Sequence, residues 1–158
     1  MSQINLSDLS GSPLFKGMAT KEVEYLNSIF TLSQVVAGKT VFVENMPGES
    51  LYLIRQGTVQ ISQMLAEVDE QDLMTLEAGE LFGEMAVIDG GNRSVTARIV
   101  KNAVLFVLKR KDFNKLVSEQ PRLGLQLTLN IVRIFSARTR SAKKDYRTML
   151  TASLAQKN

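Results

Sequence analysis

Cysteine and histidine are both absent from this chain of 158 residues. Their absence excludes disulfide bonds, thiolate nucleophiles, metal sites built on Cys or His ligands, and the usual general base of acyl-transfer chemistry. Long apolar runs are missing too: none approaches the roughly 20 residues of a membrane-spanning helix, and charged residues are mixed into the first thirty. We therefore expect a soluble, cytoplasmic protein without a membrane span or a metal site.

The length and the content of 44% apolar and 22% charged residues are typical of one domain with an appendage. Charge is unevenly distributed along the chain. Residues 1–100 carry six Lys and Arg against thirteen Asp and Glu, whereas residues 101–158 carry thirteen against three. An acidic body of net charge −7 is therefore followed by a basic segment of net charge +10.

Short β-type runs separated by small turn signals such as Gln56-Gly57 fill the centre of the sequence. The predicted strands are 32–36, 40–43, 51–54, 58–62, 73–76, 94–100 and 103–108. The connections are too short for the helical crossovers that parallel strands need, so the pattern predicts a small antiparallel barrel or sandwich. Ala37-Gly38-Lys39-Thr40 looks like the end of an ATPase phosphate-binding loop, but strands follow it, and we interpret it as a hairpin turn.

Helical periodicity is found on both sides of these strands. Thr20 is a plausible N-cap for a short helix at about 20–30, and a second short helix is predicted at 111–118. A long helix is predicted from Pro121 to about Leu150. Its first half is apolar nearly all round, through Leu123, Leu125, Leu127, Leu129, Ile131, Val132, Ile134 and Phe135. A surface helix needs only one apolar stripe to pack on its own domain. The remaining apolar side of this helix must therefore cover a partner helix or a ligand.

The candidate chemistry is concentrated in Phe82-Gly83-Glu84-Met85-Ala86 and in Arg93-Ser94. A helix of one or two turns entered through a glycine presents unpaired N–H groups, which suit an anion, and Arg93 on the following strand can add two parallel donors to the same phosphate. A carboxylate beside a phosphate would repel it, so Glu84 is better suited to a sugar hydroxyl. Phosphate and sugar together indicate a nucleotide.

These residues resemble the cyclic-nucleotide-binding domains shared by bacterial catabolite activator proteins, kinase regulatory subunits and cyclic-nucleotide-gated channels. The frame at 51–57, Gly79 and the nine-residue step from Glu84 to Arg93 are similar as well, and the resemblance covers about residues 13–140. It implies a mainly β fold with capping helices. The expected architecture is a double-stranded β-helix (jelly-roll-like) barrel with a short N-terminal helix, a cassette helix at the site and a long C-terminal helix.

The resemblance also implies a domain organisation. Residues 1–12 are expected to be an N-terminal tail, 13–120 the binding barrel with its N-terminal helix, 121–150 a lid and dimerisation helix, and 151–158 a tail. The DNA-reading helix-turn-helix domain of the catabolite activators needs about 60 or more residues beyond the long helix. Fewer than twenty remain here, so we expect a stand-alone member.

By this resemblance Glu84 binds the ribose 2′-hydroxyl and Arg93 binds the cyclic phosphate. The phosphate cradle is completed by Gly83, Met85, Ala86 and Ser94. Val95 stands where the family usually has alanine, and its two extra methyl groups are expected to crowd the pocket. The purine is expected beside Ile61, Met74 and Leu76, and the long helix is expected to close over it with Ile134 and Arg138.

The favoured hypothesis is a sensor of cAMP or cGMP that is not an enzyme, needs no cofactor and repositions its C-terminal helix when the nucleotide binds. We expect a homodimer through that helix and an unidentified protein effector. Two alternatives remain: a structural or dimerisation module without a ligand, and nucleic-acid binding through the basic helix. The basic residues are Arg133, Arg138, Arg140, Lys143, Lys144 and Arg147. From Arg138 onward Tyr146 is the only aromatic residue available for base stacking, which disfavours nucleic acid.

Overall fold

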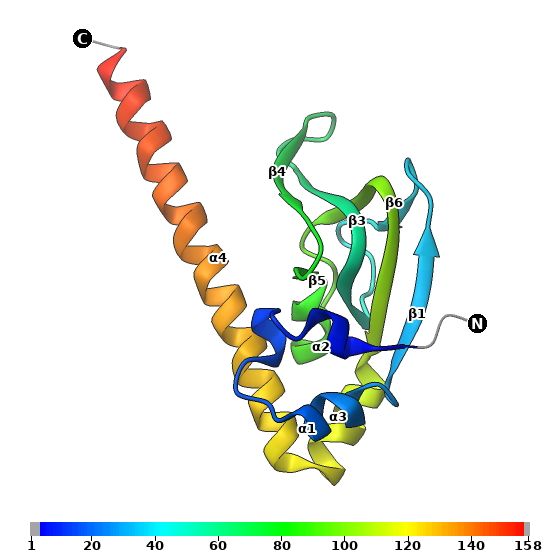
Figure 1. Ribbon diagram of the computed structural model, residues 1–158. Helices are drawn as coiled ribbons and strands as arrows, with labels where there is room; N and C mark the ends of the chain where they lie inside the picture. The colour runs from blue at the N-terminus through cyan, green and yellow to red at the C-terminus, as the bar shows by residue number, and fades with distance from the viewer. Residues whose placement is uncertain (1–3, 157–158) are drawn as a thin grey trace.

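Two long strands, β3 (Ser50–Met64) and β6 (Thr96–Lys109), form the centre of the computed structural model, which describes residues 4–156 (Figure 1). β6 pairs with β3, with β1 (Phe30–Val35) and with β2 (Thr40–Phe42). β3 also pairs with β4 (Glu70–Leu76) and β5 (Leu81–Phe82), and every pairing is antiparallel. The predicted mainly β, jelly-roll-like fold with capping helices is confirmed.

The predicted breaks within the two central strands are wrong. Strands 51–54 and 58–62 are one strand, and so are 94–100 and 103–108, except that β6 begins at Thr96. Gly57 was read as a turn, but it lies within β3 at φ 98°, where the register with β6 shifts repeatedly. A Cβ atom there would lie 2.5 Å from the Asn102 carbonyl oxygen. The glycine therefore allows a bulge that bends the paired strands without ending them.

Helices cover one end and one side of the barrel. They are the 3₁₀ turns η1 (Leu6–Leu9) and η2 (Pro13–Phe15), α1 (Thr20–Leu26), α2 (Glu84–Asp89), α3 (Arg110–Glu119) and α4 (Pro121–Ala155). The N-cap of α1 is Ala19, not Thr20, because the Glu22 carboxylate accepts the Ala19 N–H at 2.8 Å. α1 ends before the predicted residue 30, because Phe30 already begins β1.

Two of the predicted boundaries change. The expected tail at 1–12 belongs to the packed fold from residue 4 onward, because Leu6 is fully buried and the Ser12 hydroxyl donates to the Gly79 carbonyl at 2.7 Å. The expected tail at 151–158 is helical as far as Ala155. Residues 1–3 and 157–158 of these two tails lie outside the described residues.

The side chains of β6 point alternately into two hydrophobic cores. Leu105 and Val107 pack in a core inside the barrel, whereas Phe106 and Leu108 pack in a core under the helices. Successive side chains of a strand point to opposite faces, so this strand serves both cores at once. The cavity described below lies beside this barrel core, and residues of β4 and β5 line it.

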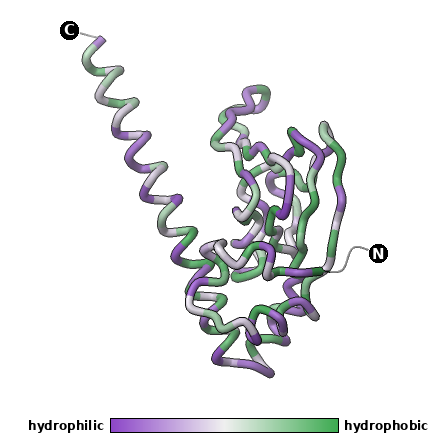
Figure 2. Tube along the Cα trace, viewed as in Figure 1, coloured by the Kyte–Doolittle hydropathy of each residue, from purple (hydrophilic) through white to green (hydrophobic). Residues whose placement is uncertain are grey.

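The two halves of α4 have different surroundings (Figures 1 and 2). The first half packs on η2 and α3, and its Leu123, Leu127 and Ile131 are buried. The second half runs away from the barrel, and hydrophilic and hydrophobic residues alternate along it (Figure 2). Tyr146, Met149 and Leu154 are exposed there. Among residues 4–156 no helix has the length and apolarity required to cross a bilayer.

Candidate ligand-binding site

A cavity of about 210 Å³ lies between the barrel, α2 and α4. Its walls come from β3, β4 and β5, the segment from Gly83 to Val95, and one face of α4. The structure brings together eleven of the twelve residues named from the sequence: Gly83, Glu84, Met85, Ala86, Arg93, Ser94, Val95, Ile61, Met74, Leu76 and Arg138. Residues scattered over 78 positions of sequence, from Ile61 to Arg138, thus share one cavity.

Gly83 shapes the entrance to α2. It is the N-cap of this helix at φ 74°, in the left-handed region that side chains rarely adopt. A Cβ atom on Gly83 would lie 2.6 Å from Arg93 Nη1 and 3.0 Å from the Ser50 carbonyl oxygen. The first N–H groups of a helix have no intrahelical partner. Glu84, Met85 and Ala86 therefore bring backbone donors to the wall of the cavity.

Arg93 was predicted to lie on a strand, but it lies in the loop before β6. Its N–H donates to the Met46 carbonyl and its carbonyl accepts the Asn45 N–H, both at 2.8 Å. The adjacent Asn92 forms an isolated bridge with Pro47. The loop before β3 therefore holds the backbone of Arg93 in place and directs its side chain inward.

The guanidinium of Arg93 is held on three sides, and the residue is only 6% exposed. Nη1 donates to the Gly83 carbonyl at 3.0 Å. Cζ lies 4.0 Å from the centre of the Phe42 ring and 5.7 Å from that of Tyr52, which places the cation against aromatic faces. Nε is buried and has no hydrogen-bond partner among residues 4–156.

This environment is unfavourable for a charge. Burial lowers the pKa of Arg93 below its ordinary value, and the nearby Tyr52 and Glu84 offset part of that effect. A buried donor without a partner costs about 1–3 kcal/mol, and more when the group is charged. An anion that reached Nε and the free edge of the guanidinium would recover that energy.

Glu84 and Arg138 connect α2 to α4. The side chain of Glu84 is 10% exposed, and its Oε1 lies 3.5 Å from Arg138 Nη1. Arg138 Nη2 also donates a short hydrogen bond to the Leu81 carbonyl. Arg138 therefore joins the long helix both to the cassette helix and to β5.

The opposite wall of the cavity is apolar. Ile61 and Leu76 are buried and Met74 is half-buried. Val95 is half-buried and packs against the barrel core. Ser94 is exposed, and its hydroxyl lies 3.7 Å from Met85 Sδ.

Ile134 is the one predicted residue that does not line the cavity. It packs against the helical core instead, and the face of α4 toward the cavity carries Phe135, Thr139 and Ala142. Neighbouring residues of a helix are separated by about 100° of rotation, so an error of one residue changes the face. Arg138 lies on the cavity face of α4.

Sequence reasoning missed the residues that hold Arg93. Phe42, Tyr52 and Phe82 form an aromatic cluster with ring centres 5.0 to 5.9 Å apart. A Cβ atom on Gly48 would lie 2.6 Å from Arg93 Nε and 2.6 Å from Ala86 Cβ. Gly48 lies in the loop before β3, and nothing in the spacing of the aromatic residues indicates that they meet an arginine.

The cavity offers the guanidinium groups of Arg93 and Arg138, backbone donors, one carboxylate and an apolar wall. Within the described ranges no group of three or more acidic residues is placed to hold a metal ion. The arrangement suits a ligand that is anionic at one end and apolar at the other, with a hydroxyl between them.

Comparison with known proteins agrees with this description. A family model described as "Cyclic nucleotide-binding domain" matches residues 32–120, which is more than half of the chain. The "Cyclic AMP receptor protein" of Thermus thermophilus is 35% identical over 125 residues, which are 79% of this chain and 58% of the receptor. This chain therefore spans little more than half the length of that relative.

Solved structures with similar folds include two bacterial proteins. A cyclic nucleotide-binding domain from Methylobacillus flagellatus matches with a TM-score of 0.81 and 26% identity, over 89% of this chain and 79% of that one. The catabolite activator protein of Thermus thermophilus matches with a TM-score of 0.77 and 33% identity, over 87% of this chain and 63% of that one. On the match of the family model and these folds, the chain belongs to the cyclic nucleotide-binding domain family.

Proposed function

We propose that the chain binds a cyclic nucleotide, cAMP or cGMP, in the cavity beside α2, and that it acts as a regulatory domain and not as an enzyme. The observation that carries the proposal is Arg93. Its guanidinium is buried at the cavity wall, and its Nε has no hydrogen-bond partner among residues 4–156. The cyclic phosphate is the anion that completes this site.

The phosphate is expected between Arg93 and the start of α2. A guanidinium binds phosphate through two parallel hydrogen bonds, and first-turn N–H groups add further donors. Gly83 Cα leaves the space for this close approach, since a side chain there would meet Arg93 Nη1. Ser94 is exposed beside the same wall, so its hydroxyl is available to the phosphate.

Glu84 is assigned to the ribose 2′-hydroxyl. The carboxylate lies on the wall that also carries Arg93, and it is almost fully buried. A hydrogen bond from a neutral hydroxyl to a buried carboxylate is stronger than one between neutral groups. A nucleotide with a 2′-hydroxyl is therefore preferred over its 2′-deoxy form.

The base is assigned to the apolar wall of Ile61, Met74 and Leu76, with Phe135 of α4 opposite it. The Thermus thermophilus relative is a cyclic AMP receptor protein by name, which supports cAMP as the ligand. The wall itself is apolar and does not discriminate between adenine and guanine.

α4 is proposed as the responding element. Its Arg138 pairs with Glu84, and a ribose hydroxyl that donates to Glu84 changes this ion pair directly. A ligand shifts a conformational equilibrium only through contacts that differ between the two states. The Arg138–Glu84 contact is such a difference, so nucleotide binding is expected to reposition α4.

A homodimer through α4 is proposed as the assembly. Exposed apolar residues recur at three- and four-residue spacing in two segments of the helix: Leu125, Leu129, Val132 and Phe135 in the first, and Tyr146, Met149 and Leu150 in the second. An apolar stripe of this kind, even though it is interrupted between residues 135 and 146, marks an interaction surface. A second copy presents a complementary stripe, and the repositioned dimer would then act on a protein effector.

Calorimetric titration of the full chain with cAMP, cGMP, 5′-AMP and 2′-deoxy-cAMP tests the proposal. The protein is first unfolded and refolded to remove any bound nucleotide. A cyclic nucleotide is expected to bind at least tenfold more tightly than 5′-AMP, because the site is compact, and thermal stability should increase by about 2.7 kcal/mol at 100 times Kd. No binding of either cyclic nucleotide at millimolar concentration would refute the proposal and favour a module without a ligand.

A further inference from the structure

A second groove, of about 340 Å³, lies on another side of α4. It is formed where the segment after η2 crosses α4, next to the turn between β4 and β5 (Figure 1). Arg138 is the only described residue that lines both this groove and the cyclic-nucleotide cavity. Ile134, predicted to cover the nucleotide, lies in this groove instead.

One buried amide at the groove bonds to the backbone of one cationic residue and to the guanidinium of another. Asn130 is 1% exposed and donates to the carbonyls of Leu14 and Lys16 at 2.8 and 2.9 Å. Its Oδ1 accepts a hydrogen bond from Arg133 Nη1 at 3.2 Å. The backbone of Lys16 and the guanidinium of Arg133 are therefore anchored to the same side chain.

These cations lack a partner of opposite charge. In the part of the chain that the structure describes, neither Lys16 nor Arg133 forms an ion pair. The single carboxylate that lines the groove is Glu80, and it accepts the N–H of Glu77 at 2.8 Å within its own turn. Three cations, with Arg138 as the third, thus face one carboxylate that is engaged elsewhere.

The rest of the groove is apolar. Leu81 is buried, Ile134 is half-buried, and Pro13 and Ala137 complete this part of the wall. The volume is at the lower end of the range for small-molecule sites. We propose that the groove binds a small organic anion, in which a carboxylate or phosphate pairs with Lys16 and Arg133 and a compact apolar group lies on Leu81 and Ile134.

Arg138 couples the groove to the nucleotide cavity. Its Nη2 donates to the Leu81 carbonyl on the groove side, and its Nη1 pairs with Glu84 on the cavity side. An anion in the groove attracts this guanidinium and weakens the pair with Glu84, which leaves Glu84 free to accept the ribose hydroxyl. This coupling, which rests on the proposed function, makes the anion and the nucleotide raise each other's affinity by the same factor.

The binding half of the proposal is tested without any nucleotide. Phenyl phosphate and benzoate are titrated into the full chain while backbone amide signals are followed by NMR, with benzyl alcohol as the uncharged control. Both anions are expected to shift the signals of Lys16, Leu81 and Ile134, and benzyl alcohol is not. The same titration in Arg93→Ala identifies the site, because shifts caused by the nucleotide cavity disappear there and shifts caused by the groove persist.

Arg133→Gln is expected to weaken both anions at least about fivefold, the scale of one charge-assisted hydrogen bond at a partly exposed site. Arg122→Gln is the matched control, because Arg122 is exposed on the same helix and lines neither cavity. Equal affinities in the two variants, or shifts confined to residues around Arg93, would overturn the anion site.

The coupling half compares the Kd for cAMP with and without saturating phenyl phosphate. The wild-type protein is expected to bind cAMP more tightly when the anion is present. Arg133→Gln is expected to lose this effect because it no longer binds the anion. Arg138→Gln is expected to lose the effect although the anion still binds. An unchanged or weakened Kd in the wild type refutes the coupling. A chain that binds anions but no cyclic nucleotide refutes the proposed function and leaves the groove site standing.

Discussion

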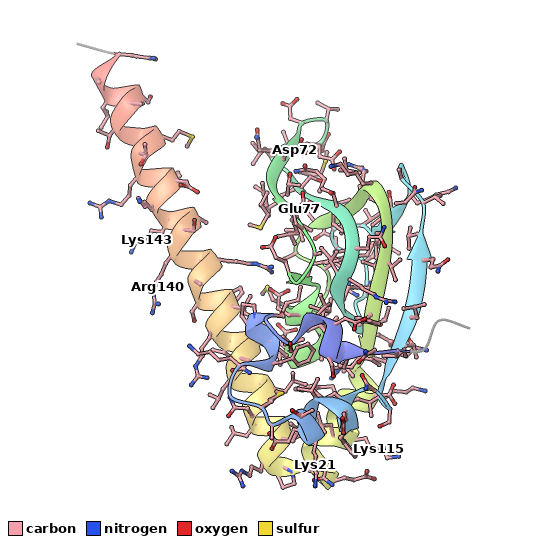
Figure 3. The ribbon with its side chains drawn as sticks, in the orientation of Figure 1. Lys21, Asp72, Glu77, Lys115, Arg140 and Lys143 are labelled. Atoms are coloured by element: carbon pink, nitrogen blue, oxygen red, sulfur yellow. The ribbon has the colours of Figure 1, made fainter. Side chains whose placement is uncertain are left out.

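The cassette around α2, from Phe82 to Ser94, and the distal half of α4 hold their charges in opposite ways. In the cassette, Glu84 and Arg93 are less than a tenth exposed. Glu84 pairs with Arg138, and Arg93 donates to the Gly83 carbonyl. On distal α4, Arg140, Lys143, Lys144 and Arg147 are exposed, and none forms an ion pair within residues 4–156. Arg140 and Lys143 project from the side of α4 away from the barrel (Figure 3).

This difference suits the buried charges of the cassette to specific binding and the exposed charges of distal α4 to long-range attraction. Buried charges are costly to leave unpaired, so a ligand that pairs with them gains a large and geometry-dependent free energy. Exposed charges are hydrated and screened by salt, and each contributes little. Acidic residues such as Asp72 and Glu77 lie on the barrel side (Figure 3). The acidic body and the basic segment inferred from the sequence are therefore separated in space as well, and the distal half of α4 forms a basic arm. The cassette is therefore expected to select the ligand, and the arm to act on partners.

The strongest test of this comparison removes the buried cation. Arg93→Ala is expected to weaken cyclic-nucleotide binding by about 2–3 kcal/mol, which is about 30- to 150-fold in Kd, because a charge-assisted hydrogen bond is lost in a desolvated site. Arg122→Ala removes an exposed arginine that lines no cavity and should leave Kd unchanged. Calorimetry of both variants, with circular dichroism to establish folding, gives the result. Similar affinities for the two variants would contradict the assigned role of Arg93.

The second prediction concerns the packing around the Arg93 side chain. In Gly48→Ala the new methyl group meets Ala86 Cβ and Arg93 Nε at 2.6 Å, so the cassette must shift. Overpacking of this kind costs about 1–3 kcal/mol of the free energy of unfolding, measured in urea. Gly11→Ala is the control, because a Cβ atom there meets nothing within 4 Å. A Gly48→Ala protein as stable as the control would show that the loop before β3 does not constrain Arg93.

A ligand change combined with a mutation sharpens the role of Glu84. Glu84→Ala is expected to weaken cAMP about tenfold, the low end for a hydrogen bond to a charged group. For 2′-deoxy-cAMP the same mutation should have little effect, since the hydroxyl is already missing. Glu24→Ala, on the exposed face of α1, serves as the carboxylate control. If both nucleotides lose affinity equally, Glu84 does not bind the ribose.

The smallest effect on the ligand is expected from the exposed arm. A chain ending after Ala142 keeps Phe135, Arg138 and Thr139 at the cavity, and removes three of the four distal basic residues and the exposed apolar residues from Tyr146 onward. Its Kd for cAMP should stay within about twofold, because contacts beyond the cavity add little to a small ligand. Its mass in solution, measured by light scattering, should shift toward the monomer, since part of the apolar stripe is gone. An unchanged dimer would place the interface on the proximal half of α4.

Much of the candidate site could be predicted because its residues are close in sequence. Gly83, Glu84 and Arg93 fall within eleven positions, and a glycine followed by a helical turn and a later arginine has a local physical meaning as an anion site. Strand alternation likewise predicts that Ile61, Met74 and Leu76 face inward, where they line the cavity. The errors arose where the outcome depended on distant contacts. Gly57 became a bulge because β6 lies against it, and Ile134 faced the core because η2 and α3 orient α4.

The sequence by itself determined the β-rich class, the three main helices, the uneven charge and the segment that carries the anion site, because each depends on periodicity or on neighbouring residues. Only the tertiary structure decided what surrounds Arg93 and what Arg138 connects. Phe42 and Gly48 reach Arg93 across 51 and 45 positions, and Arg138 reaches Glu84 across 54. Contacts over such separations are set by packing of the whole chain, and no local pattern encodes them.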